Sequence, residues 1–307
     1  MKFHFAPVQG HTDAAYRHFH AKNYGALTDY YTPFIRLEKG TIRQRDLKDF
    51  SSDLNSEVHL VPQIIFRDKD ELNSLVEILK ENGATEIDLN MGCPFPLQTG
   101  HGRGAATIAN DQLASDVETT VKENPDVKFS LKMRLGFIQP DEWKTLLPHL
   151  NNIHLEHIAV HPRVAKQQYG GELHLNQFEE LLKVSTNPVI FNGEIHSPDD
   201  IRHTIEQFPD IAGIMIGRGL LNRPSLIAEY ISGKDMDKEH RLELMLKFHR
   251  QLLEHYSSIL CGESQIISKI KPFWEYAESE IGKKSYKAIK KASNIAKYHS
   301  AVASILS

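Results

Sequence analysis

A cysteine lies between a glycine and a proline at positions 92–94, within the segment NMGCPFPLQTGHGRGA that spans residues 90–105. A thiol in such a turn can serve as a proton donor, as a nucleophile or as a small filler of the core. Gly92 would let the backbone approach a ligand closely, and Pro94 would fix the direction in which the chain leaves the turn. The role of Cys93 therefore depends on the residues around it.

Two other segments carry groups that could bind an anion. Asn192 and Gly193 end one apolar run, and Gly217 and Arg218 follow the next. Free backbone N–H groups at a strand-to-helix turn, together with a guanidinium, are typical of a phosphate site. We therefore expect the two segments to hold a phosphate.

Lys132 also follows an apolar run, so its ammonium would point into the same site and interact with an anion or an electron-rich carbonyl. A cation there would stabilise the reduced, anionic form of an isoalloxazine ring. The amides of Gln63 and Asn90 could contact the edge of that ring. These three residues favour a flavin as the ligand.

Short β-like runs recur through the first 220 residues and alternate with amphipathic stretches of helix length. They cover residues 3–8, 26–31, 58–65, 86–90, 127–134, 157–162, 188–193 and 211–217. Eight such units predict an α/β fold, a (β/α)₈ TIM barrel, although a doubly wound open sheet would alternate in the same way. Polar residues at the end of every run favour the barrel, because its strands converge at one catalytic face.

Beyond Arg223 and Pro224 the strand pattern stops and the sequence becomes helical. We predict a barrel domain over residues 1–235 and a helical domain over residues 236–307. The second segment has 12 Lys and Arg against 8 Asp and Glu, although the whole chain has a formal net charge of −4. This asymmetry in charge suggests that the helical domain binds a polyanion.

Composition excludes several classes of protein. The 307 residues are 40% hydrophobic and 25% charged, and no run approaches the roughly 20 apolar residues of a membrane span. The opening MKFHFAPVQG lacks the apolar core of a signal peptide, so we expect a cytoplasmic protein. Cys93 and Cys261 are the only cysteines, and no Cys/His cluster has zinc spacing, so we expect neither disulfides nor a metal.

Taken together, the motifs resemble those of the tRNA-dihydrouridine synthases over almost the whole chain. The segments that carry the resemblance are FAPVQGHTD, PQI, LNMGCP, LKMRLG, HPR with QQYGG downstream, FNGEI and IMIGRGLL. Their order and approximate spacing match the family. NMGCP and the GR after the eighth run are the most specific of them.

The resemblance implies an enzyme with tightly bound FMN in the barrel and a helical domain that engages tRNA. Cys93 matches the catalytic cysteine, which gives a proton to uracil C5 after flavin N5, reduced by NADPH, has delivered hydride to C6. The matching cofactor contacts, together with Asn90, are Pro7, Val8, Gln9, Gln63, Lys132, His161, Asn192, Gly193, Glu194, Gly217 and Arg218. No protein partner is evident.

The RNA contacts are expected at the strand ends and on the tail. Arg134 and Arg163 end two of the runs. The tail carries Lys283, Lys284, Lys287, Lys290 and Lys291, interleaved with aromatic residues that include Phe273, Trp274, Tyr276 and Tyr286. Basic residues alternating with aromatic ones are typical of nucleic-acid binding.

Two departures from the family pattern are visible. Val8 replaces the usual Met, which matters little if that contact is made by the backbone. The loop after Cys93 often carries Lys, but here its only basic residues are His101 and Arg103. We expect this change to affect which uridine is modified rather than the chemistry.

Two alternatives stay open at this point. One is an FMN barrel oxidoreductase that acts on a free pyrimidine, of the dihydroorotate or dihydropyrimidine dehydrogenase type, which would not require a basic helical tail. The other is an RNA-binding barrel without catalytic activity, which would contain no flavin. The sequence does not specify the modified position, the choice between tRNA and ribosomal RNA, the preference between NADPH and NADH, or the oligomeric state.

Overall fold

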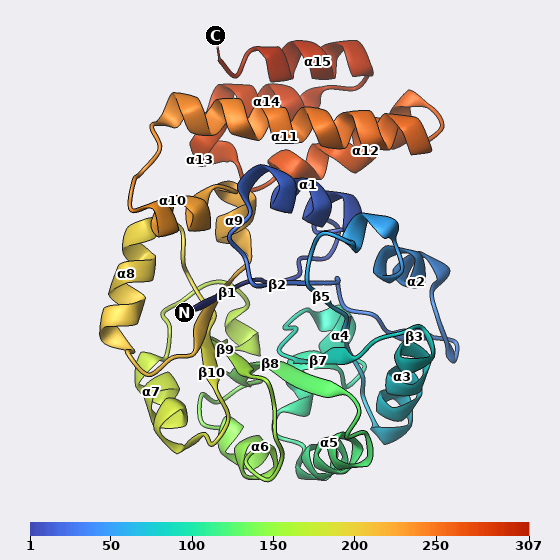
Figure 1. Ribbon diagram of the computed structural model, residues 1–307, viewed down its shortest axis with the longest axis vertical. Helices are drawn as coiled ribbons and strands as arrows, with labels where there is room; N and C mark the ends of the chain where they lie inside the picture. Colours follow the sequence, from blue (N-terminus) through green and yellow to red (C-terminus); the bar gives the residue numbers. More distant parts are fainter. Residues whose placement is uncertain (307) are drawn as a thin grey trace.

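The computed structural model describes residues 1–306, which form a barrel with a group of helices at one end (Figure 1). The barrel strands are β1 (Lys2–Phe5), β2 (Asp29–Tyr31), β5 (Leu60–Val61), β6 (Gln63–Ile64), β7 (Glu86–Met91), β8 (Lys128–Gly136), β9 (Ile158–Val164), β10 (Val189–Phe191) and β11 (Gly213–Ile216). All neighbouring strands pair in parallel, in the order β5-β2-β1-β11-β10-β9-β8-β7-β6.

The two end members of this order are consecutive in the chain, because only Pro62 separates β5 from β6. Proline has no N–H to donate to the hydrogen-bond ladder between strands, so the one predicted strand is divided into two short strands. β5 pairs with β2 and β6 pairs with β7, and together they close the sheet. The predicted eight-stranded barrel is therefore confirmed, and the open doubly wound sheet is excluded.

Helices cover the outside of the barrel. They are α1 (Ala14–Tyr24), α3 (Lys69–Glu81), α5 (Asp111–Glu123), α6 (Trp143–Leu150), α7 (Leu175–Val184), α8 (Pro198–Gln207), α9 (Arg218–Asn222) and α10 (Leu226–Ser232). Local sequence sets their limits: α3 begins where Asp68 accepts a hydrogen bond from the N–H of Glu71, and it ends at Asn82 and Gly83, whose φ is +88°.

The strands are buried on both faces, as is usual for parallel sheets between helices and a closed interior. A small apolar layer fills the barrel itself and consists of Ala6, Tyr31, Val61, Ala159, Ile190 and Met215. A much larger apolar core lies between the strands and the outer helices. Above the inner layer, the carboxyl ends of the strands are left free to carry polar side chains.

Three of the loops at these carboxyl ends contain additional short elements of secondary structure. The segment between β2 and β5 forms a small hairpin, β3 (Leu37–Glu38) with β4 (Thr41–Ile42), and a helix, α2 (Gln44–Phe50), followed by a 3₁₀ turn at Asp53–Asn55. The loop after β7 contains α4 (Pro96–Thr99) and a 3₁₀ turn at Gly104–Thr107, and the loop after β9 contains a 3₁₀ turn at Ala165–Gln167.

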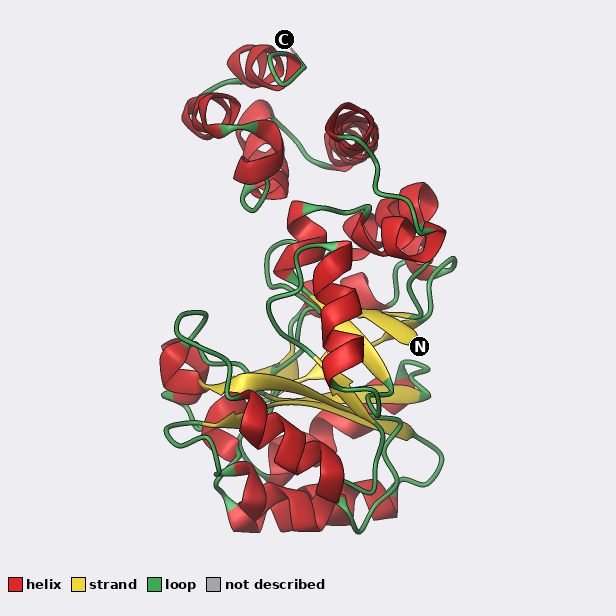
Figure 2. Cartoon of the chain, turned by 90° about the vertical axis from the view of Figure 1, so that its left-hand side faces the viewer, coloured by secondary structure: helices red, strands yellow, loops and turns green. Residues whose placement is uncertain are grey.

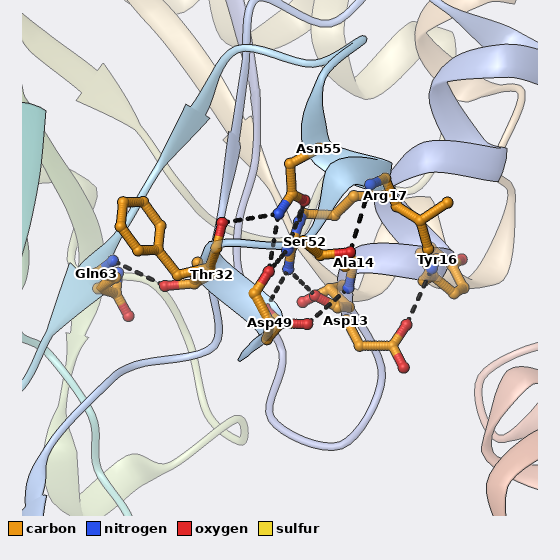
Figure 3. A network of polar contacts seen from close by, with 12 residues as sticks. Asp13, Ala14, Tyr16, Arg17, Thr32, Asp49, Ser52, Asn55 and Gln63 are labelled. Carbon is orange, nitrogen blue, oxygen red and sulfur yellow. Dashed lines mark hydrogen bonds and ion pairs between the residues drawn. The ribbon is translucent and has the colours of Figure 1, made fainter. Parts of the chain in front are cut away.

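A buried arginine ties the first of these loops to α1 (Figure 3). The guanidinium of Arg17 donates to the backbone oxygen of Thr12 at 2.7 Å, to Asp49 at 2.9 Å and to Asn55 at 2.8 Å. The other carboxylate oxygen of Asp49 accepts from the N–H of Ala14 at 2.7 Å. A charged group that is buried must be paired in this way, so the network fixes the loop after β2 at the barrel mouth.

The chain leaves α10 at Gly233 and continues in a second group of helices: α11 (Lys238–Ile259), α12 (Glu263–Ile270), α13 (Glu278–Ile281), α14 (Lys283–Lys291) and α15 (Ile295–Ala303), with a 3₁₀ turn at Lys271–Trp274. They gather at the α1 end of the molecule (Figures 1 and 2). The rings of Tyr16 and Phe248 lie 4.9 Å apart, and the hydroxyl of Tyr256 donates to Asp13 at 3.0 Å.

The chain passes from the barrel to the second group of helices between residues 233 and 237. The division at residue 235 into two independent domains stays a prediction. Among residues 1–306, no helix combines the length and the apolar character needed to cross a membrane.

Candidate active site

A cavity of about 840 Å³ opens at the carboxyl ends of the strands. Its volume lies within the roughly 300–1,000 Å³ typical of small-molecule sites. Its walls include all the residues expected to act in catalysis or to contact the cofactor: Pro7, Val8, Gln9, Gln63, Asn90, Cys93, Lys132, His161, Asn192, Gly193, Glu194, Gly217 and Arg218. These strand-end residues therefore lie around one cavity, as the sequence predicts, whereas the role of each residue stays a prediction.

Contacts with Asn90, Ala105 and Gly104 fix the conformation of the turn that contains Cys93. The side-chain oxygen of Asn90 accepts the N–H groups of Gly92 and Cys93 at 3.1 and 3.0 Å. The carbonyl oxygen of Cys93 accepts the N–H of Ala105 at 3.0 Å. Gly104 lies beneath it with φ of +62°, where a Cβ would come within 2.6 Å of that oxygen. The loop after β7 therefore presents the thiol in one orientation.

Burial raises the pKa of the Cys93 thiol above its ordinary value, although a hydrogen bond from the backbone of Phe95 and the charges of Lys132 and Arg134 act in the opposite direction. The residue is 8% exposed and lines the cavity. At neutral pH the thiol keeps its proton. It is therefore suited to give a proton to a bound ligand rather than to attack it.

Gly92 has a structural role in addition to the one expected. A Cβ at this position would lie 3.1 Å from the carbonyl carbon of Met133 on β8. The missing side chain thus allows the Cys93 turn to pack against the neighbouring strand. Gly92 also lines the cavity, and close approach of its backbone to a ligand stays a prediction. Tertiary packing of this kind is invisible in a single sequence.

Lys132 points into the cavity without a partner of its own. Within the described residues it forms no hydrogen bond and no ion pair. Burial lowers the pKa of its ammonium to about 8, and the charge of Arg134 contributes in the same direction. A buried cation without a partner is costly unless a ligand supplies negative charge or electron density.

Below Lys132 lies the carboxyl group of Asp88, whose pKa burial raises to about 6. Asp88 accepts hydrogen bonds from the hydroxyl of Ser130 at 2.6 Å and from the amide nitrogen of Gln63 at 2.7 Å. The amide oxygen of Gln63 in turn accepts from Asn90 at 2.7 Å. A chain of hydrogen bonds thus runs from the barrel interior to the turn that holds Cys93.

This chain changes the interpretation of two predicted cofactor contacts. Gln63 and Asn90 were expected to contact the edge of a flavin ring with their amides. Each uses amide atoms inside the protein, and Gln63 is 1% exposed. Their contribution visible in the structure is to fix the position of Cys93.

The corner expected to hold a phosphate is built around Glu194, which has an unusual φ of +35°. Its carboxylate pairs with Arg163, with Arg218 at 3.0 Å and with His196 at 3.2 Å. Burial raises the pKa of Glu194, but its hydrogen bonds to Arg163 and His196 outweigh burial, so the pKa lies below its ordinary value. A phosphate bound here would share Arg218 with this carboxylate.

His161 is almost completely buried, and burial together with the charges of Arg134 and Lys132 holds its pKa well below the ordinary value. Its imidazole is therefore neutral at physiological pH. The positive charge of the cavity wall comes instead from Lys132 and from arginines, among them Arg134 and Arg218.

The structure does not place Arg134 and Arg163 on an RNA-facing surface, where sequence analysis expected them. They are 1% and 4% exposed. Arg134 donates to the carbonyl oxygen of Val164 at 3.0 Å, and Arg163 donates to that of Gly171 at 2.8 Å and pairs with Glu194. Arg134 lines the cavity, whereas Arg163 lies behind it. Both guanidiniums serve the interior of the site.

Sequence reasoning also missed several residues of the cavity wall. Tyr169, which is 40% exposed, lies beneath Arg218 with the guanidinium 4.2 Å from its ring centre. Its place in a glycine-rich loop directly after a strand was the available signal. Other missed residues come from the loop after β2 (Arg36, Arg43 and Arg45) and from the second group of helices (Pro272 and Glu275), and Tyr276, expected on the RNA-binding tail, also lines the cavity. The positions of these last three residues depend on how those helices dock.

The expected basic face exists on α14. Lys283, Lys284, Lys287, Lys290 and Lys291 are all exposed, and none forms an ion pair within the described residues. Phe273 and Trp274, which were expected to alternate with basic residues on an RNA-binding surface, are instead buried in the core. Lys271 is occupied as well, because its ammonium donates to the carbonyl oxygen of Lys290 at 3.1 Å.

Comparison with known sequences gives a consistent result. The family model described as dihydrouridine synthase matches residues 4–299. A probable tRNA-dihydrouridine synthase 2 from Bacillus subtilis is 28% identical over 268 residues, which are 83% of this chain and 79% of that protein. The tRNA-dihydrouridine synthase B of Pseudomonas syringae is 30% identical over 184 residues, which are 58% of this chain and 53% of that protein.

Solved structures share the fold at low sequence identity. Morphinone reductase superimposes with a TM-score of 0.55 at 10% identity, over 77% of this chain and 87% of that one. Histamine dehydrogenase from a Rhizobium species gives 0.57 at 12% identity, over 86% of this chain and 50% of that one. These similarities support the barrel architecture.

Proposed function

The chain belongs to the dihydrouridine synthase family and is an oxidoreductase that reduces uridine in tRNA to 5,6-dihydrouridine, and we propose that it does so with FMN held in the barrel cavity and reduced by NADPH. One observation carries the proposal: a protonated thiol, Cys93, and an unpartnered ammonium, Lys132, line the same cavity. The first suits proton transfer to a base, and the second suits an electron-rich ring.

The residues of the cavity fit FMN. Lys132 would stabilise the electron-rich edge of the isoalloxazine ring, because its ammonium has no hydrogen-bond or ion-pair partner among residues 1–306. Arg218 and the first N–H groups of α9, which have no partner within their helix, would hold the phosphate. The loop of Pro7, Val8 and Gln9, with Asn192, Gly193 and Gly217, would enclose the rest of the cofactor. When bound and reduced, the flavin supplies the hydride for C6 of uracil.

The protein supplies the proton for C5. The cavity wall contains several protonatable residues, among them Cys93 and His161. His161 is neutral at physiological pH, and a neutral imidazole is a very weak acid. The Cys93 thiol is protonated, and the hydrogen bonds to Asn90 fix its backbone. Cys93 is therefore the general acid, a role that typically contributes about 10²- to 10⁴-fold to the rate.

The positive side chains of the cavity also favour the charge that develops on the substrate. Addition of hydride to C6 places negative charge towards the C4 oxygen of uracil. Arg134 lines the cavity and is held by Val164, so its charge is fixed without reorganisation during the reaction. Lys132 supplies a second positive charge to the same cavity, on the side expected to hold the flavin.

The substrate is a macromolecule, and the lysines of α14 suit its backbone. Uracil within folded RNA reaches a buried thiol only after leaving its stack. The exposed lysines of α14 would bind phosphates independently of sequence, while Tyr276, from the same group of helices, lines the cavity itself. We propose that the protein works in the cytoplasm, where it meets tRNA.

An absorbance experiment tests the proposal. The purified protein should show a flavin spectrum that anaerobic NADPH bleaches and unmodified tRNA restores. Reoxidation by free uracil or dihydroorotate instead of tRNA would replace the proposal with a small-molecule oxidoreductase. A colourless protein that takes up no FMN would refute the cofactor.

A further inference from the structure

Two exposed apolar side chains, Phe95 and Leu97, lie on the loop that follows the catalytic thiol. Phe95 is 48% exposed and Leu97 is 68% exposed, and both line the mouth of the cavity that contains Cys93. We propose that Phe95 and Leu97 form an apolar wedge, which packs against the RNA bases next to the target uridine and stabilises that uridine in its flipped-out position. This inference rests on the proposed function.

The loop holds these side chains outward. The backbone oxygen of Phe95 accepts the N–H groups of Gln98 and Thr99 at 2.8 and 3.0 Å, which forms the short helix α4. Pro94 and Pro96 flank Phe95 and restrict the backbone on both sides. The wedge therefore cannot turn into the core without loss of the turn that orients Cys93.

A buried ion pair anchors the base of the same loop. The guanidinium of Arg103 donates to both carboxylate oxygens of Glu71 on α3, at 2.5 and 3.1 Å. Arg103 is only 8% exposed, so this basic residue of the loop serves the fold and does not meet RNA. Lysine is missing from the loop and Arg103 is occupied. The exposed residues at the start of α4, Phe95, Pro96 and Leu97, are therefore apolar, and the exposed basic residue His101 follows them.

An aromatic neighbour extends the apolar surface across the cavity mouth. The rings of Phe95 and Tyr169 lie 6.1 Å apart, within the range of favourable aromatic pairs. Tyr169 in turn contacts Arg218 and, with 5.4 Å from guanidinium to ring centre, Arg134. Planar rings and guanidiniums at one opening are the groups on which nucleobases stack.

Nucleobases fit this surface better than a protein does, because it adjoins the cavity that a uracil must enter. Removal of a base from a stack exposes the faces of its neighbours, and apolar wedges from proteins commonly cover such faces. Cations surround the mouth and complement phosphates. The Nε of Arg36 is buried without a hydrogen-bond partner among the described residues, and the side chain of Arg45 is 74% exposed.

The test compares variants of the flavin-loaded full-length protein with the same unmodified tRNA transcript. The variants are Phe95→Ala, Leu97→Ala and their combination, with Phe95→Trp to restore a stacking surface. Ile138→Ala is the matched control, because Ile138 is a 46% exposed apolar residue of another loop and does not line the cavity. The measurement is the rate of flavin reoxidation at saturating tRNA after anaerobic reduction, and the flavin spectrum reports that each variant is folded.

If Phe95 and Leu97 act as a wedge, the double variant Phe95→Ala with Leu97→Ala should slow flavin reoxidation at saturating tRNA by about tenfold or more. Phe95→Trp should retain at least half of the wild-type rate, and Ile138→Ala should not change the rate. A double variant within twofold of wild type would overturn the inference, as would an equal loss in Ile138→Ala. A wild-type dimer that becomes monomeric in the double variant would assign the patch to a second copy of this chain. If no tRNA reoxidises the wild-type flavin, the proposed function itself fails.

Discussion

The barrel mouth and the outer face of α14 are both rich in positive charge, but they hold it in opposite ways. At the mouth, Arg134 lines the cavity and Arg163 lies behind it, and both are buried and hydrogen-bonded, while burial lowers the pKa of Lys132 to about 8. On α14, five lysines are exposed and, among the described residues, unpaired. Charges fixed in a cavity wall select a ligand by shape and protonation, whereas solvated charges attract a polyanion of any sequence.

This difference predicts that variants in the two regions fail in different ways. Changes in the mouth should alter the chemical step or the cofactor. Changes on α14 should alter tRNA affinity and its dependence on salt.

The largest effect is expected at the thiol. Replacement of Cys93 by Ala removes the acid but leaves the cofactor contacts, so the protein should stay yellow while tRNA reduction slows by about 10²- to 10⁴-fold. Single-turnover reoxidation of reduced flavin by tRNA measures this rate. Turnover equal to wild type would remove Cys93 from the mechanism.

The second effect concerns α14. Neutralising Lys283, Lys284, Lys287, Lys290 and Lys291 together should weaken tRNA binding by about 10²-fold and reduce the slope of log affinity against log salt by about one per lost phosphate contact. A suitable control replaces exposed lysines at the opposite end of the barrel: Lys122, Lys128 and Lys183. An unaltered slope would place the RNA on another surface.

The third effect concerns the cofactor. Lys132→Met and Arg218→Ala each remove a charged group from the cavity wall. Since a charge-assisted hydrogen bond contributes about 1.5–3 kcal/mol, FMN affinity should fall by roughly tenfold or more in each variant. Titration of the flavin-free proteins with FMN measures the change. Wild-type affinity in both variants would refute the proposed orientation of the cofactor.

The smallest effect is a dependence on pH. With a pKa of about 8 in the free protein, Lys132 is charged at pH 7 and loses its proton as the pH rises through 8. Affinity for FMN should therefore decline above pH 8 by at most about tenfold per unit. Arg134, whose pKa burial lowers to about 10, keeps its charge in this range. In Lys132→Met the decline should disappear, and its persistence would assign the titration to another group.

Much of the barrel could be predicted because each strand is an apolar run that ends in a polar residue. The parallel arrangement brings all of these ends to one face, so the sequence alone predicts that Asn90, Lys132 and Asn192 lie close together. Pro62 explains the one difference in strand count, and its missing N–H was visible in the sequence.

The errors have a common physical origin in tertiary contacts. Whether an arginine at a strand end faces solvent or a carboxylate depends on a partner distant in the chain, as with Arg163 and Glu194. Trp274 looked available to stack on RNA, but α11 and α15 enclose it, and its indole donates to Tyr298 at 2.9 Å. Pairings of this kind follow from how elements pack, which local patterns do not encode.

The central claim is that the cavity around Cys93 reduces uridine within tRNA. The most direct test is nucleoside mass spectrometry of an unmodified tRNA transcript after incubation with the flavin-loaded protein and NADPH. The account predicts dihydrouridine in proportion to the NADPH consumed, and its loss with the Cys93→Ala variant. Reduced flavin that yields no dihydrouridine in any tRNA, but is reoxidised by a free pyrimidine, would contradict it.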